Sequence, residues 1–243
     1  MSQNILSPTS INTYLRCPRK YYLKYIKGLK ERPSIHLIRG KAVHDSISRF
    51  HQMDIRKFNT LEEMKTELLS LFNQAWVEQG EEFRRLKLPE GMLNEYYSES
   101  AEMLISWLKR HVKAVRDGQA KPDTEVKLFS QTHRVMGIID AVFRQNGTVS
   151  LTDYKTGKKE ELTQDIKIQM AIYALLYQEN FGMLPDSITI DFLKLESQAT
   201  FPVTDEFTNY AIKMCKDIHE NTSSTNEEDY PCKCGGWCAR DFL

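Results

Sequence analysis

Residues 137–157 decide the fold, and they read GIIDAVFRQNGTVSLTDYKTG. Two stretches rich in β-branched and aromatic residues, 134–144 and 148–154, flank the pair Asn146-Gly147. Asn-Gly favours the tight two-residue turn that joins adjacent antiparallel strands. The segment therefore predicts a β-hairpin, and the rest of the chain is interpreted outward from it.

Charged residues interrupt both strands of this hairpin. Asp140 lies in a strongly apolar stretch, where a charge is costly unless it is paired or binds a cation. Asp153 and Lys155 are two residues apart, so their side chains share one face of the second strand with Leu151. We expect the two aspartates to converge on adjacent strands beside the lysine.

This group has a catalytic and a structural interpretation. Two carboxylates offer the hard oxygen ligands that Mg²⁺ and Mn²⁺ prefer. A neighbouring ammonium can orient water and stabilise charge that builds on a phosphate, so the group suits metal-dependent phosphodiester hydrolysis. The alternative is a plain surface ion pair, because an Asp-x-Lys triplet alone often arises by chance.

The flanking sequence predicts an α/β fold with a helical N-terminal region. The expected elements are, in chain order, mainly helices over residues 7–116, a strand over 125–131, the hairpin, a helix over 162–181, a strand over 187–193 and a helix from 205 to about 219. We expect a single domain over 1–243, with a mainly helical part (1–120), an α/β core (121–220) and a cysteine-rich tail (221–243).

The composition indicates a soluble globular protein, since 41% of the residues are hydrophobic and 27% are charged. No apolar run approaches the ~20 residues that cross a bilayer, and the opening MSQNILSPTS lacks the pattern of a secretory signal. We therefore expect a cytoplasmic location, reduced thiols and no membrane partner.

The net charge is zero, which argues against a broad electrostatic coat for nucleic acid but not against a local basic groove. Nine basic residues and one acidic residue lie between residues 16 and 41, with tyrosines interleaved. The segment is either a solvated helix face with core tyrosines or a surface that contacts phosphates. The second interpretation predicts DNA contacts by Arg16, Arg19, Lys20 and Lys41.

Several short motifs, taken together, resemble those of the RecB-like nucleases of the PD-(D/E)XK superfamily. The matching segments are Tyr14-Leu15-Arg16-Cys17-Pro18-Arg19-Lys20-Tyr21-Tyr22, Gly40-Lys41-Ala42-Val43-His44, Gly137-Ile138-Ile139-Asp140, Asp153-Tyr154-Lys155 and Gln169-Met170-Ala171-Ile172-Tyr173. Each motif is short, but their joint occurrence in this order is specific. The resemblance implies a restriction-endonuclease-like core, a small mixed sheet flanked by helices.

The resemblance also implies roles for individual residues. The expected catalytic residues are Asp140, Asp153, Lys155, Gln169 and Tyr173, and the expected Mg²⁺ or Mn²⁺ ligands are His44, Asp140, Asp153 and the carbonyl of Tyr154. Gln169 and Tyr173 share one helix face, where they either contact DNA or brace the lysine. Glu125 is expected near the site. Without these partners, His44 would more often be structural than a ligand.

Five cysteines occur, and in a reducing compartment such a cluster suggests metal or iron–sulfur binding more than disulfides. By resemblance, Cys17, Cys232, Cys234 and Cys238 would bind a [4Fe-4S] cluster that staples the tail to the domain. The spacing departs from the usual Cys-x-x-Cys tail, and four-thiolate zinc or incidental cysteines are the alternatives. Cys215 is expected to be a buried thiol.

The resemblance implies an exonuclease that processes single-stranded or duplex DNA ends in recombination, repair or CRISPR adaptation. An endonuclease and a catalytically inactive, metal-stapled DNA-binding module are the alternatives. The sequence contains no Gly-x-x-x-x-Gly-Lys-Ser/Thr phosphate loop, so any unwinding would need a partner. A helicase, a recombinase and a CRISPR integrase are the partner classes that we expect.

Overall fold

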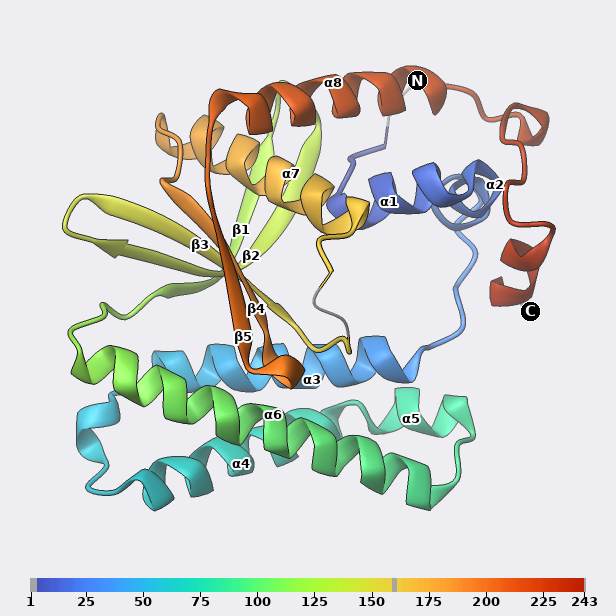
Figure 1. The fold of residues 1–243 in the computed structure, drawn as a ribbon. Coiled ribbons are helices and arrows are strands. Elements are labelled where there is room, and N and C mark those ends of the chain that lie inside the picture. Colours follow the sequence, from blue (N-terminus) through green and yellow to red (C-terminus); the bar gives the residue numbers. More distant parts are fainter. Residues whose placement is uncertain (1–3, 159–160, 243) are drawn as a thin grey trace.

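The computed structural model describes residues 4–158 and 161–242, and it has a five-stranded sheet between two helical layers (Figure 1). The sheet has the order β1-β2-β3-β4-β5, with β3 and β4 parallel and the other neighbours antiparallel. The strands are β1 (Asp123–Ser130), β2 (Val135–Gln145), β3 (Thr148–Lys155), β4 (Ser187–Phe192) and β5 (Ser197–Pro202). The expected small mixed sheet is therefore confirmed.

Eight α-helices are described. They are α1 (Pro8–Arg16), α2 (Pro18–Tyr21), α3 (Ile35–Gln52), α4 (Leu61–Glu78), α5 (Gly80–Leu86), α6 (Glu90–Arg116), α7 (Gln164–Phe181) and α8 (Asp205–Asn221). Helices α1, α7 and α8 cover one face of the sheet, and α3, α4 and α6 form the layer on the other face (Figure 1). None of the described helices is long and apolar enough to cross a membrane.

Local sequence explains where several elements begin and end. The Ser7 side chain accepts a hydrogen bond from the Ser10 amide in a capping box, and Pro8 occupies the first turn of α1. The Asn146-Gly147 turn joins β2 to β3, and both residues adopt the left-handed conformation that this turn requires. Gly182, also left-handed, ends α7. These signals are local, so the sequence alone predicts them.

Two sequence-based expectations need correction. β1 begins at Asp123, so Glu125 lies inside the strand instead of opening it. The edge strand β5 was not expected at all, although Ala199 and Phe201 alternate with exposed residues along it. This weak alternation over six residues is typical of an edge strand, which is half solvated and therefore has little apolar signal.

Two apolar cores lie on opposite faces of the sheet, and β3 contributes to both. Leu151 packs in the core beneath α7, whereas Tyr154 packs in the core against α3 and α6. The Tyr154 hydroxyl lies 3.1 Å from His51 Nε2 in that second core. The strand end that carries the candidate site is thus held from both sides.

Candidate active site

Asp140 lies where the side chains of β2 stop alternating regularly between the two faces of the sheet. Ile139 and Val142 both pack in the core beneath α7, although they are three residues apart and a regular strand would place them on opposite faces. Asp140 falls within this irregular step, and its Oδ2 accepts a 2.8 Å hydrogen bond from the backbone amide of Tyr154 on β3. The irregularity turns the carboxylate toward the neighbouring strand, so Asp140 meets the next carboxylate-bearing segment.

His44 approaches Asp140 from α3. Its Nδ1 lies 3.1 Å from Asp140 Oδ1. Burial opposes protonation of the imidazole, but the charge of Asp140 and its hydrogen bond outweigh burial and raise the pKa of His44 to about 9. Burial likewise opposes ionisation of Asp140, yet the His44 charge and the Tyr154 amide lower the pKa of that carboxyl. The pair is therefore a position where the protein stabilises positive charge next to a carboxylate.

A second network surrounds Asp153 at the end of β3. Lys155 Nζ lies 2.7 Å from Asp153 Oδ2, so the two side chains share a face as expected. Gln169 on α7 accepts a hydrogen bond from Lys155 at 2.7 Å and donates one to Asp153 Oδ1 at 2.7 Å. It also donates to the Tyr173 hydroxyl at 2.7 Å. Of the two roles expected for Gln169 and Tyr173, this geometry favours bracing the lysine and the carboxylate.

The donor set fits a divalent cation. Asp153 is 2% exposed, and burial raises the pKa of its carboxyl, with the charge of Lys155 offsetting part of the effect. Asp153 Oδ2 contacts the Lys155 ammonium but accepts no well-aligned hydrogen bond from the described residues. We interpret the contact as Coulombic, because Lys155 Nζ lies 2.7 Å away without forming a hydrogen bond to this oxygen. A buried carboxylate oxygen with spare acceptor capacity is suited to a cation ligand.

His44, Asp140 and Asp153 do not by themselves surround a cation. Among the described residues, the four expected cysteines form the only group of three or more His, Cys, Asp or Glu ligand atoms within 4.8 Å of one another. The candidate catalytic residues therefore leave coordination positions free on a cation bound between them. Mg²⁺ is usually bound by one or two carboxylates together with waters and substrate oxygens, and an open set leaves room for them.

Glu125 lies beside this group in a strained conformation. Its φ of 52° is left-handed, which is uncommon for a residue other than glycine inside a strand. Burial, and after it the charge of Asp140, raises the pKa of the Glu125 carboxyl. The structure thus brings Glu125 near Asp140, as the sequence predicted from resemblance.

Arg39 is a residue whose place the sequence did not reveal. It belongs to the basic run, yet its side chain is 2% exposed. Arg39 Nη2 donates a 2.8 Å hydrogen bond to the carbonyl of Thr156, the residue after Lys155, and Nη1 lies 3.1 Å from Glu99. Its guanidinium also stacks over Tyr96, with 5.3 Å between the guanidinium carbon and the ring centroid. Arg39 is therefore a positioning residue that ties α3 to the end of the Asp-x-Lys segment.

Replacing Arg39 with methionine is expected to lower the free energy of unfolding by about 1–3 kcal/mol, because the Thr156 carbonyl loses its buried donor. Urea denaturation measures this change. The matched control is Arg49→Met on the same helix, where a partly exposed arginine pairs with Asp45 and Glu78 and should contribute less than about 1 kcal/mol. Equal losses in the two variants would contradict the bracing role.

The four predicted DNA contacts have different surroundings. Arg16 is exposed and pairs with Asp165, whereas Lys41 is exposed on α3, three residues before His44. Arg19 pairs with Glu227, and Lys20 Nζ lies 2.6 Å from both Glu31 and Asp241. Arg19 and Lys20 thus bind the acidic C-terminal segment, and phosphate contact by either would compete with these ion pairs.

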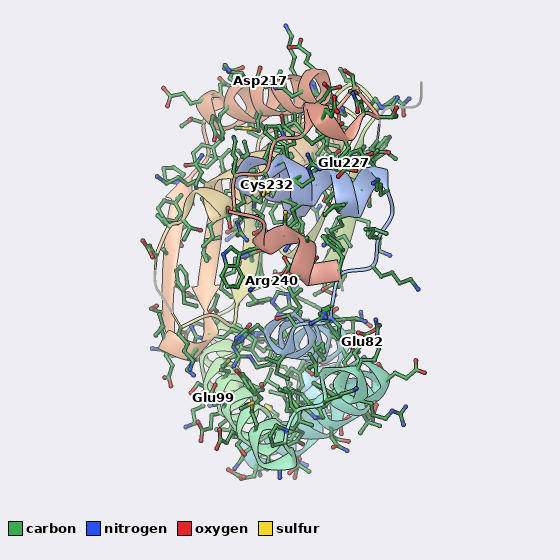
Figure 2. All side chains as sticks on the ribbon, turned by 90° about the vertical axis from the view of Figure 1, so that its right-hand side faces the viewer. Glu82, Glu99, Asp217, Glu227, Cys232 and Arg240 are labelled. Carbon is green, nitrogen blue, oxygen red and sulfur yellow. The ribbon has the colours of Figure 1, made fainter. Side chains whose placement is uncertain are left out.

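The expected cysteine group is assembled in the structure. Cys17 follows α1, and Cys232, Cys234 and Cys238 lie on the C-terminal segment, which passes beside the N-terminal helices (Figure 2). Their four Sγ atoms lie within 4.8 Å of one another. Cys215 lies elsewhere, fully buried in α8, and burial raises the pKa of its thiol to about 12. The separation of Cys215 from the group is as predicted.

Comparisons with known proteins show the family to which the chain belongs. The family model described as "PD-(D/E)XK nuclease superfamily" matches residues 5–240. The CRISPR-associated exonuclease Cas4 of Francisella tularensis subsp. novicida is 29% identical over 157 residues, which are 63% of this chain and 69% of that protein. One of the subunits of the ATP-dependent helicase/deoxyribonuclease of Carboxydothermus hydrogenoformans is 28% identical over 210 residues, 75% of this chain but only 19% of that protein.

A solved structure shares the fold. The crystal structure of a candidate exonuclease from Eubacterium rectale superposes with a TM-score of 0.60, covering 99% of this chain and 89% of the other at 13% sequence identity. The residues matched by the family model span nearly the whole chain. The chain therefore belongs to the PD-(D/E)XK nuclease superfamily and, within it, to the RecB-like nucleases, which are hydrolases of phosphodiester bonds.

Proposed function

We propose that this chain is a divalent-metal-dependent deoxyribonuclease that removes nucleotides from DNA ends. The observation that carries the proposal is the convergence of two networks at the end of β3, His44 with Asp140 and Lys155 with Asp153. Family membership supports the nuclease activity, and the names of the Cas4 and Eubacterium rectale proteins support exonuclease action.

In this proposal His44, Asp140, Asp153 and the Tyr154 carbonyl would hold Mg²⁺ or Mn²⁺, and the ion would polarise the scissile phosphate and lower the pKa of a coordinated water. Lys155 places its ammonium where negative charge develops on the phosphate. Gln169 fixes both Lys155 and Asp153, and Tyr173 fixes Gln169. The protein side chains need form no covalent bond to DNA.

Nuclease assays on linear and circular DNA of either strandedness test the proposal. Labelled linear and circular substrates, each single- or double-stranded, are incubated with Mn²⁺, Mg²⁺ or EDTA. We expect metal-dependent release of nucleotides from linear DNA and intact circles. Cleavage of circles would identify an endonuclease, and DNA binding without cleavage under any metal would identify the inactive binding module.

Lys41 is the best-placed candidate for phosphate contact, because it is exposed one helical turn before His44. Lys41→Gln is expected to weaken DNA binding about equally for all sequences and to reduce the slope of log K against log salt by about 1. Lys213→Gln on α8, which removes an exposed lysine from another surface, is the matched control. A salt slope unchanged by Lys41→Gln would remove this residue from the DNA path.

We also propose that residues 1–243 act as one nuclease domain and that DNA unwinding, where it is needed, comes from a partner such as a helicase. The match to a helicase/deoxyribonuclease subunit supports such a partner. The match to a CRISPR-associated exonuclease supports a CRISPR integrase as an alternative partner, a recombinase is the third class, and co-purification with each class separates them.

A further inference from the structure

The four-cysteine group is too compact for an iron–sulfur cubane. The sulfur–sulfur distances in the structure are 4.0 Å for Cys17–Cys232, 3.5 Å for Cys232–Cys234 and 3.7 Å for Cys232–Cys238. Four thiolates around one tetrahedral Zn²⁺, each about 2.3 Å from the ion, lie about 3.8 Å apart. In a [4Fe-4S] cluster each thiolate binds a different iron, which spreads the sulfurs to roughly 6 Å. We infer that the group binds one Zn²⁺ ion and not the iron–sulfur cluster implied by the resemblance.

The backbone of the tail supports a single-ion site. The Gly236 amide donates a 3.3 Å hydrogen bond to Cys232 Sγ, and the Cys238 amide donates a 3.1 Å hydrogen bond to Cys234 Sγ. Gly235 and Gly236 both have positive φ, so the chain can fold back sharply between the second and third tail cysteines. This turn directs three sulfurs toward one point and supplies donors to two of them.

Contacts on either side of the cysteines fix how far apart the two segments can move. Lys20 Nζ lies 2.6 Å from Asp241, and the Arg32 amide donates a 2.7 Å hydrogen bond to the Asp241 carbonyl. Arg19 Nε donates a 2.9 Å hydrogen bond to the Tyr230 carbonyl on the other side of the group. These contacts hold the tail against residues 19–32 on both sides of the cysteine group, and a single ion requires no movement of either segment.

Two of the four cysteines are buried beside an aromatic cluster. Cys17 and Cys238 are 2% and 3% exposed. Next to them, Tyr21 and Tyr230 are almost fully buried, with their rings stacked at 6.4 Å between centroids. The zinc would thus join residue 17 to residues 232–238 at the edge of an aromatic cluster, well apart in sequence from the proposed catalytic residues.

Metal analysis of the full chain tests the inference independently of nuclease activity. Protein produced with both iron and zinc in the medium and purified without oxygen is expected to contain about one zinc per chain, with neither iron nor inorganic sulfide above background. After chelation, added Co²⁺ should give the visible bands of tetrahedral thiolate coordination. Stoichiometric iron and sulfide with broad visible absorption, or a chain without any bound metal, would overturn the assignment.

Cysteine variants locate the ion. Cys232→Ser and Cys234→Ser are expected to lose the zinc, and because neither residue is buried these variants should still fold. Cys215→Ala, which removes the cysteine outside the group, should retain it. Full zinc content in Cys232→Ser, measured on protein with a native circular dichroism spectrum, would place the ion elsewhere.

Discussion

Replacing Asp153 with asparagine is expected to reduce DNA cleavage on the order of 10³-fold or more, because the variant loses one of two carboxylates available to a divalent cation. The shape of the side chain is retained, and its Oδ1 can still accept the hydrogen bond from Gln169. The Lys155 ammonium, however, loses its anionic neighbour. Initial rates of nucleotide release at saturating Mn²⁺ measure the effect.

The same variant should fold at least as stably as the wild type when no divalent cation is added. Burial raises the pKa of Asp153 above its value in the unfolded chain, so the ionised carboxylate destabilises the fold at neutral pH. Asparagine removes this cost, and the gain should disappear as the pH falls below the carboxyl pKa of the unfolded chain. Added Mn²⁺ should raise the melting temperature of the wild type but not of the variant.

Asp217→Asn is the control for this experiment, since its carboxylate is exposed on α8, a helix that contributes no residue to the site (Figure 2). It should cleave DNA like the wild type and keep the Mn²⁺-dependent rise in melting temperature. Cleavage by Asp153→Asn at the wild-type rate would show that Asp153 is not catalytic.

Replacing Lys155 with methionine is expected to reduce kcat about 10²–10³-fold, the usual effect of removing one group that stabilises developing charge. The aliphatic part of methionine fills the same space, so DNA binding and the Mn²⁺-dependent stabilisation should change much less than kcat. Single-turnover rates at saturating enzyme separate the chemical step from binding.

Lys109→Met makes the same substitution at an exposed position on α6, a helix that carries none of the proposed site residues. This variant should leave kcat unchanged. If Lys155→Met raised KM while leaving kcat intact, Lys155 would be a DNA-binding residue and not a catalytic one.

The hairpin and its charged residues could be predicted from the sequence because the signals are local. A two-residue Asn-Gly turn sets the pairing of β2 with β3, and that pairing brings Asp140 close to Asp153. The family resemblance added His44, which approaches from a helix about a hundred residues earlier. Periodic patterns in the sequence predict local structure, so they could not predict the contact between His44 and Asp140.

Other features depend on tertiary contacts that leave little local trace. Arg39 belongs to a basic run that is typical of a solvated surface, yet a backbone carbonyl just after β3 draws it into the interior. Edge strand β5 has only a weak apolar alternation. For the cysteines, the sequence predicts which residues gather, but only the separation of the sulfur atoms distinguishes one ion from a cluster.

Tyr154 connects the packing of α3 and α6 to the position of the Asp140 carboxylate. Its backbone amide holds Asp140, whereas its ring is anchored beside His51 and Trp107 among the helices. A chimera that took α6 from a relative would therefore need residues that pack equally well around this ring. A poorly matched α6 could leave the protein folded and still shift the Tyr154 amide, which would misalign the Asp140 carboxylate that this amide binds.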